Sequence, residues 1–198
     1  MCPATLLNEI ARQGFLDALE IMLLIEGIER QNHGRIAGRL SDRGAGAAGI
    51  VVRNSLITRI TVLVARCYAR IHEGNGDMNL RRAFDEFLKQ DQIRCDLKTA
   101  GTLGDIETAE RLWSEALVDP NLKQIEHFRH KHTAHLAEPT PGMKNPDYGD
   151  FFAFARRTAR IMEALAHGVG GTRETLDDHA DDFVMSSQEF WRPWDPMA

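Results

Sequence analysis

The stretch NLKQIEHFRHKHTAHLAEP, residues 121–139, contains the pattern on which the fold prediction depends most. At about 100° of rotation per residue its apolar side chains gather on one side of a helix: Leu122, Ile125, Phe128 and Leu136. Asp119-Pro120 directly precedes it, which is typical of an N-cap followed by proline at the first helical position. We therefore expect an amphipathic helix over residues 120–137.

Other segments show the same helical spacing, and none alternates with the period of two that marks a strand. We expect further helices over residues 4–31, 50–71, 80–90, 105–117 and 151–167. These elements predict an all-α fold, a single-domain helical bundle in which two long N-terminal helices pack with a later helical pair. The domain is expected to span residues 1–170, and residues 171–198 form a C-terminal tail.

The tail is first acidic and then aromatic, with Glu174, Asp177, Asp178, Asp181 and Asp182 followed by Phe190, Trp191 and Trp194. Three roles are open to it: it packs on the bundle as an extra helix, it covers a basic cleft, or it docks a partner. Packing is the default interpretation, because tryptophan and phenylalanine bury large apolar surfaces.

The composition excludes several classes of protein. With 43% hydrophobic and 27% charged residues, the 198-residue chain resembles an ordinary globular domain. Its net charge of −5 argues against holding nucleic acid through overall basic charge. Three unpaired cysteines, the lack of a signal peptide and the lack of an uninterrupted apolar run of about 20 residues predict a cytoplasmic protein with no membrane partner.

Two short patterns suggest ligands that we do not expect. Gly44, Gly46 and Gly49 match G-x-G-x-x-G, but no strand precedes them, so a flexible loop between helices explains them better than a dinucleotide site. Four histidines lie between His127 and His135 at spacings that could chelate a metal. Because the sequence has no HExxH motif and no cysteine near these histidines, we expect no metal and no cofactor.

The helix phase separates these histidines. On an ideal helix His127 and His130 lie largely on the solvent side, whereas Arg129, His132 and His135 lie on or beside the apolar stripe. Desolvating an arginine is costly unless it is paired or lines a wet cleft. These three side chains, Arg129, His132 and His135, therefore need either buried partners within the subunit or a functional role.

Residues 129–135, RHKHTAH, resemble the R-x(4–6)-H signature of the HEPN superfamily (higher eukaryote and prokaryote nucleotide-binding domains). In the bacterial abortive-infection branch this signature commonly appears as R-x-K-x-x-A-H. Residues 54–70, NSLITRITVLVARCYAR, are similar to the long second helix of that branch. Many members also contribute a polar residue from an earlier helix, and the sequence alone does not identify it.

The resemblance implies a metal-independent endoribonuclease, a toxin or phage-defence effector that acts on RNA as a homodimer, with an antitoxin protein as a candidate partner. In this interpretation His135 is the general acid or base, Arg129 clamps the phosphate, and His132 orients the substrate or supports His135. On an ideal helix Arg129 and His135 lie about 9 Å apart along the axis and about 120° apart around it. Two subunits would therefore build a composite active site.

Candidate RNA contacts lie on two segments: Lys131 in the motif, and Arg59, Arg66 and Arg70 along one side of the second long helix. The alternative for these arginines is a solvated face paired with carboxylates. The alternative functions are a non-catalytic RNA- or nucleotide-binding module and a protein-interaction module in which Arg129 is a buried ion-pair partner.

Overall fold

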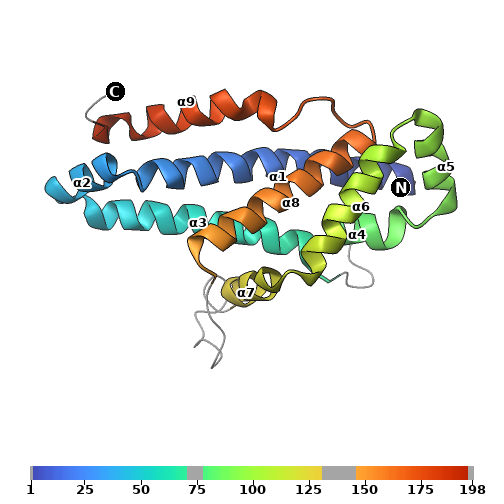
Figure 1. Cartoon of the computed structure of the whole chain (residues 1–198), viewed down its shortest axis with the longest axis horizontal. Coiled ribbons are helices and arrows are strands. Elements are labelled where there is room, and N and C mark those ends of the chain that lie inside the picture. Colours follow the sequence, from blue (N-terminus) through green and yellow to red (C-terminus); the bar gives the residue numbers. More distant parts are fainter. Residues whose placement is uncertain (1, 71–77, 131–145, 196–198) are drawn as a thin grey trace.

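A computed structural model of the chain describes residues 2–70, 78–130 and 146–195, and all the regular elements in these ranges are helical (Figure 1). The all-α prediction is therefore confirmed. The helices are α1 (Pro3–Gln31), α2 (Gly34–Asp42), α3 (Gly46–Tyr68), α4 (Leu80–Arg82), α5 (Asp91–Ala100), α6 (Leu103–Val118), α7 (Pro120–Phe128), α8 (Tyr148–Gly168) and α9 (Ala180–Trp191). A π-helical turn (Ala83–Phe87) and two 3₁₀ turns (Asp177–His179 and Arg192–Trp194) complete them.

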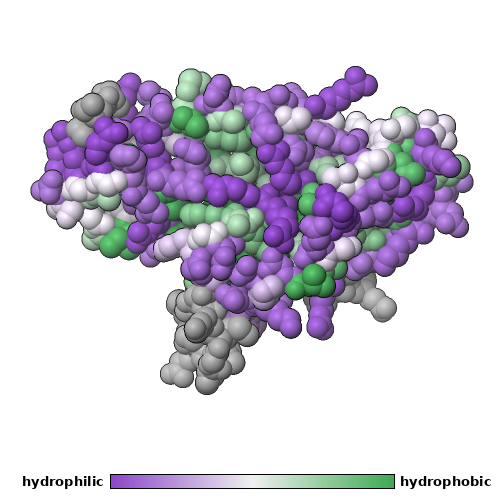
Figure 2. Space-filling view, viewed as in Figure 1, coloured by the Kyte–Doolittle hydropathy of each residue, from purple (hydrophilic) through white to green (hydrophobic). Residues whose placement is uncertain are grey.

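The bundle is organised around α1, which packs against α3, α8 and α9. In Figure 1, α1, α3 and α9 run side by side along the long axis, and α8 crosses α1 and α3 obliquely. Helix α6 packs on the second half of α8, and α7 packs against α3 and α8 at the lower edge of the view. Hydrophilic side chains cover most of the visible surface, interrupted by smaller hydrophobic areas (Figure 2).

A small cluster of Ile36, Leu40 and Trp191 joins α2 to α9, and the main hydrophobic core joins α1 with α3 through α8 by their branched and aromatic side chains. Its fully buried members include Ile21, Ile25 and Ile28 of α1, Ile60 and Leu63 of α3, Ile106 of α6, Ile125 of α7, and Phe154 and Ile161 of α8. The core therefore reaches α7, the helix that leads into the motif.

Helices α6 and α8 approach each other closely at Gly168. A Cβ atom at this position would overlap the side chain of Ile106 and lie 3.1 Å from its backbone nitrogen. We expect Gly168→Ala to lower the free energy of unfolding by about 1–3 kcal/mol, the usual cost of overpacking a core. Gly104→Ala on α6 is the control, because nothing lies within 4 Å of that position. Urea unfolding of both variants tests this, and a Gly168→Ala variant as stable as Gly104→Ala would contradict the packing.

The glycine-rich stretch differs from the sequence prediction. Residues 34–42 form α2 and α3 begins at Gly46, so the expected loop is reduced to a tight connection in which Gly44 has φ of 71°. At Gly49 a Cβ atom would lie 3.0 Å from Leu40 and 3.1 Å from the Gln31 amide, which donates a hydrogen bond to the Gly49 carbonyl at 2.6 Å. The prediction of a loop was wrong over residues 46–49, because tertiary packing of α1, α2 and α3 outweighs the low helix propensity of glycine.

Helix α3 also meets a criterion that the sequence prediction did not apply. Over an 18-residue window its mean hydropathy is 1.5, and among the described helices it is the one long and apolar enough to cross a membrane. The sequence prediction counted only uninterrupted apolar residues and so did not single out this helix. The core helix of a bundle can meet the same criterion; 33% of this window is buried, and α3 packs against α1, α7 and α8.

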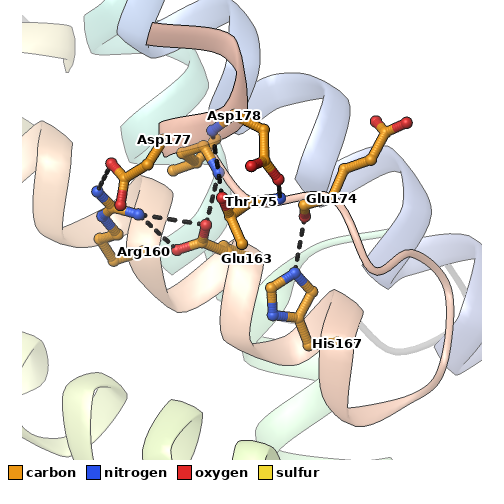
Figure 3. Close-up of polar contacts among 8 residues, drawn as sticks. Arg160, Glu163, His167, Glu174, Thr175, Asp177 and Asp178 are labelled. Atoms are coloured by element: carbon orange, nitrogen blue, oxygen red, sulfur yellow. Dashed lines mark hydrogen bonds and ion pairs between the residues drawn. The ribbon is translucent and has the colours of Figure 1, made fainter.

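The tail packs on the bundle, as the default interpretation expected. The buried carboxylate of Glu163 on α8 accepts a hydrogen bond from the Leu176 backbone N–H at 2.6 Å and pairs with Arg160, which also pairs with Asp177 (Figure 3). His167 contacts the Glu174 carbonyl oxygen at 2.7 Å (Figure 3).

Further along, α9 lies on α1. The Trp191 indole donates to the Gly27 carbonyl at 2.9 Å, and its ring packs with Ile36 and Leu40 of α2. The tail thus joins the two ends of the bundle, α8 at one end and α2 at the other.

Candidate functional site

Helix α7 holds the start of the motif in a fixed place. The Asp119 side chain accepts from the Asn121 backbone N–H at 2.8 Å and pairs with Arg157 of α8 at 2.7 Å. Leu122 and Ile125 are buried in the core. The predicted N-cap is confirmed, and its second bond ties the first turn of α7 to α8.

The α-helix ends at Phe128, and residues 129–130 continue in a wider π-helical turn. Arg129 is exposed in this turn, so the expectation that it lies on the inward side of the helix was wrong. The departure from ideal α-helical rotation accounts for the change. Among the described residues Arg129 has no carboxylate partner, so they provide no buried ion pair for it.

The two described histidines of this segment, His127 and His130, differ in their exposure to solvent. His130 is exposed, as expected. His127 is half-buried and its Nε2 atom is enclosed without a hydrogen-bond partner among the described residues, so placing it on the solvent side was wrong. The reason is that α3, α6 and α8 all pack on α7 and cover more of it than its apolar stripe.

The remaining motif positions, Lys131, His132 and His135, lie outside the described residues. Their roles stay predictions, as does the extension of the helix to residue 137. Among the described residues no group of three or more histidine, cysteine, aspartate or glutamate side chains could hold a metal.

A pocket of about 560 Å³ opens beside the start of the motif. Its described lining comes from three elements: Asn54, Ile57 and Thr58 of α3, Phe128 at the end of α7, and Pro146, Asp147, Tyr148 and Phe151 at the start of α8. Phe128 directly precedes Arg129, so a residue that lines the pocket is next in the chain to the exposed arginine.

Sequence reasoning missed Asn54 and Thr58. They lie one turn apart on α3, both are exposed, and both line the pocket. They are candidates for the polar contribution from an earlier helix that the sequence alone did not identify. The sequence did contain a signal for them: two polar residues four positions apart lie at the start of the segment that resembles the second HEPN helix, and on a helix such residues share one face.

The candidate RNA-contacting arginines of α3 form ion pairs with α1. Arg59 donates two hydrogen bonds to the Glu20 carboxylate, at 2.6 and 2.8 Å, and Arg66 pairs with the buried carboxylate of Asp17. The hydrogen bond from Arg59 lowers the pKa of Glu20, and the same bond raises the pKa of Arg59. These contacts match the ion-paired alternative for Arg59 and Arg66, while Arg70 is exposed.

The Glu20–Arg59 pair gives a pH-dependent prediction. Because the folded-state pKa of Glu20 lies below its ordinary value of 4.5, the pair stabilises the fold above that pH and loses its effect as the pH falls through the lowered value. The side chains of Arg59 and Glu20 are 50% and 36% exposed, so solvent screens the pair and we expect Glu20→Gln to cost at most about 1 kcal/mol at pH 7. Urea unfolding at pH 7 and at pH values below 4.5 should show this difference shrinking toward zero. Glu107→Gln, at an exposed position on α6, is the control, and a difference that grows in acid would contradict the assignment.

Comparison with known proteins agrees with the resemblance to the HEPN superfamily. The HEPN family model described as AbiU2 matches residues 4–190, which include the whole bundle from α1 to α8 and the motif. No curated protein and no solved structure matches the chain. Because the match covers most of the sequence, the chain belongs to the AbiU2 branch of the HEPN superfamily, an abortive-infection family.

Proposed function

We propose that this protein is a metal-independent endoribonuclease that acts on cytoplasmic RNA as a toxin or phage-defence effector. The observation that carries the proposal is Arg129: it is exposed at the end of an anchored helix, it directly follows Phe128, which lines an open pocket, and no described carboxylate pairs with it. Arg59 and Arg66, by contrast, are paired with carboxylates of α1. An exposed guanidinium is available to a phosphate.

The chemistry follows from the residue types. A base removes the proton of the ribose 2′-hydroxyl, the 2′-oxygen attacks phosphorus, and the 5′-oxygen leaves with a proton supplied by an acid. In the proposal His135 carries out the proton transfer and His132 supports it, because imidazole titrates near neutral pH. Arg129 stabilises the additional negative charge of the transition state through paired N–H donors.

We further propose that two copies of the chain complete the active site. Exposed apolar side chains near the pocket support this: Ile50 and Val51, 51% and 65% exposed, lie on α3 about one turn before Asn54, and Tyr148 lines the pocket with 49% exposed. Neighbouring exposed apolar residues of this kind are typical of interaction surfaces. In this arrangement Arg129 and His135 of the two subunits converge on one phosphate.

The test is incubation of the purified protein with end-labelled RNA in excess EDTA, followed by both a denaturing and a native gel. We expect shortened RNA on the denaturing gel. Intact RNA that is shifted on the native gel would support the alternative, a non-catalytic RNA-binding module. Intact and unshifted RNA would contradict both and favour a protein-interaction module.

A further inference from the structure

The pocket of about 560 Å³ between α3, Phe128 and the start of α8 has a lining that favours an uncharged ring over a phosphate. Its volume lies within the range of about 300–1,000 Å³ typical of small-molecule sites. Among the described lining residues the one charged side chain is Asp147, a carboxylate. A phosphate group would be repelled there, whereas a neutral ligand with hydrogen-bond donors would not.

Aromatic side chains form part of the wall. Phe151 is buried, while Tyr148 is 49% exposed and its ring centroid lies 6.0 Å from that of Phe152. The exposed part of the Tyr148 ring is therefore held in place but still accessible. Unpaired nucleic-acid bases stack on aromatic rings of this kind.

The polar groups of the pocket match the edge of a base. Asn54 and Thr58 are exposed, and neither side chain has a hydrogen-bond partner among the described residues. One oxygen of Asp147 accepts from the Asp150 backbone N–H at 2.8 Å and caps α8, which leaves its other oxygen available to a ligand. An asparagine amide pairs with adenine, and a carboxylate accepts from the amino group of cytosine.

We infer that this pocket binds one unpaired, amino-bearing nucleobase of the RNA, such as adenine or cytosine, beside the phosphate held by Arg129. The inference rests on the proposed function, since RNA is the ligand that brings a base and a phosphate together. Tyr148 stacks on the base, and Asn54 and Asp147 contact its amino edge. Uracil is disfavoured, because carbonyl oxygens flank its single N–H and the carboxylate repels them.

The experiment measures binding to decamers that cannot be cleaved. Fluorescein-labelled 2′-fluoro RNA decamers of adenine, cytosine or uracil lack the attacking hydroxyl, so their dissociation constants report recognition independently of catalysis. We expect the wild-type protein to bind the adenine and cytosine decamers about tenfold more tightly than the uracil decamer. We expect Tyr148→Ala to weaken binding of all three about tenfold, and Tyr148→Phe to restore it.

Two further variants test the polar contacts. Asn54→Ala should reduce the preference for adenine over uracil to about twofold or less. Asp147→Asn should do the same for cytosine while keeping the helix cap, because asparagine caps helices as well as aspartate. Ser55→Ala is the matched control: Ser55 is exposed next to Asn54, and its hydroxyl is bonded to the Val51 carbonyl oxygen.

Equal binding of the three decamers by the wild-type protein would overturn the inference, and so would wild-type affinity for the adenine decamer in both Asn54→Ala and Tyr148→Ala. Failure of the proposed function has a different signature, since natural RNA would then stay intact in EDTA whatever the decamer affinities are.

Discussion

Replacing Arg129 by alanine is expected to lower the rate of RNA cleavage by a factor of about 10²–10³, the usual effect of removing a donor that stabilises transition-state charge. Because Arg129 is exposed and has no carboxylate partner among the described residues, the free energy of unfolding should change by no more than about 0.5 kcal/mol. Single-turnover cleavage and urea unfolding of the same preparation separate these effects.

Lys123→Ala is the matched control, since Lys123 is an exposed cation on the same helix outside the motif. A general salt-dependent weakening of RNA binding would affect both variants alike. Equal rates for Lys123→Ala and Arg129→Ala would contradict a catalytic role for Arg129.

The second large effect concerns the core. Trp113 of α6 lies between two aromatic rings, with its centroid 4.8 Å from Tyr68 of α3 and 4.8 Å from Phe84, at interplanar angles of 2° and 12°. The Tyr68 hydroxyl is bonded to Thr158 of α8 at 3.1 Å, and burial raises the pKa of Tyr68. This stack thus joins α3, α6 and α8.

Trp113→Ala is expected to lower the free energy of unfolding by about 3–5 kcal/mol, through lost burial and the cavity that remains. That loss is a large fraction of the stability of a typical domain, about 5–15 kcal/mol. Trp113→Phe should lose much less, because it keeps an aromatic ring in the stack.

Leu117→Ala, one turn further along α6 at a position 39% exposed, is the control and should cost less than about 1 kcal/mol. Urea unfolding followed by circular dichroism measures all three variants. Equal losses for Trp113→Ala and Leu117→Ala would show that the stack does not support the bundle.

Local signals in the sequence predicted the long helices and the start of α7 well. Asp119 and Pro120 indicate the start of that helix because an N-cap depends only on residues within the first turn, and the structure shows the expected cap. The long apolar stripe of residues 4–31 likewise predicted α1 nearly to its ends.

The helices that the sequence did not reveal bury little. In α5 the buried residue is Ile93, and in α9 the buried residues are Ser187 and Trp191, so neither helix shows a continuous apolar stripe. Their positions depend on contacts with distant segments, such as the bond from Leu176 to Glu163. Periodicity within one segment cannot report contacts of that kind.

The candidate site shows the same division. The motif itself was visible in the sequence, but the exposure of Arg129 depends on a π-helical turn, and the burial of His127 depends on three packing helices. Asn54 became a candidate only when α3 was found beside Phe128 in one pocket.

The central claim is that this chain cleaves RNA with its own side chains, and the chemistry of the RNA ends tests it most directly. Natural RNA is incubated in excess EDTA with the wild-type protein and with His135→Ala, and the products are analysed by mass spectrometry. We predict 2′,3′-cyclic phosphate or 3′-phosphate ends from the wild type and a rate about 10²–10⁴-fold lower for His135→Ala. Intact RNA with the wild type, or equal cleavage by both proteins, would contradict the account.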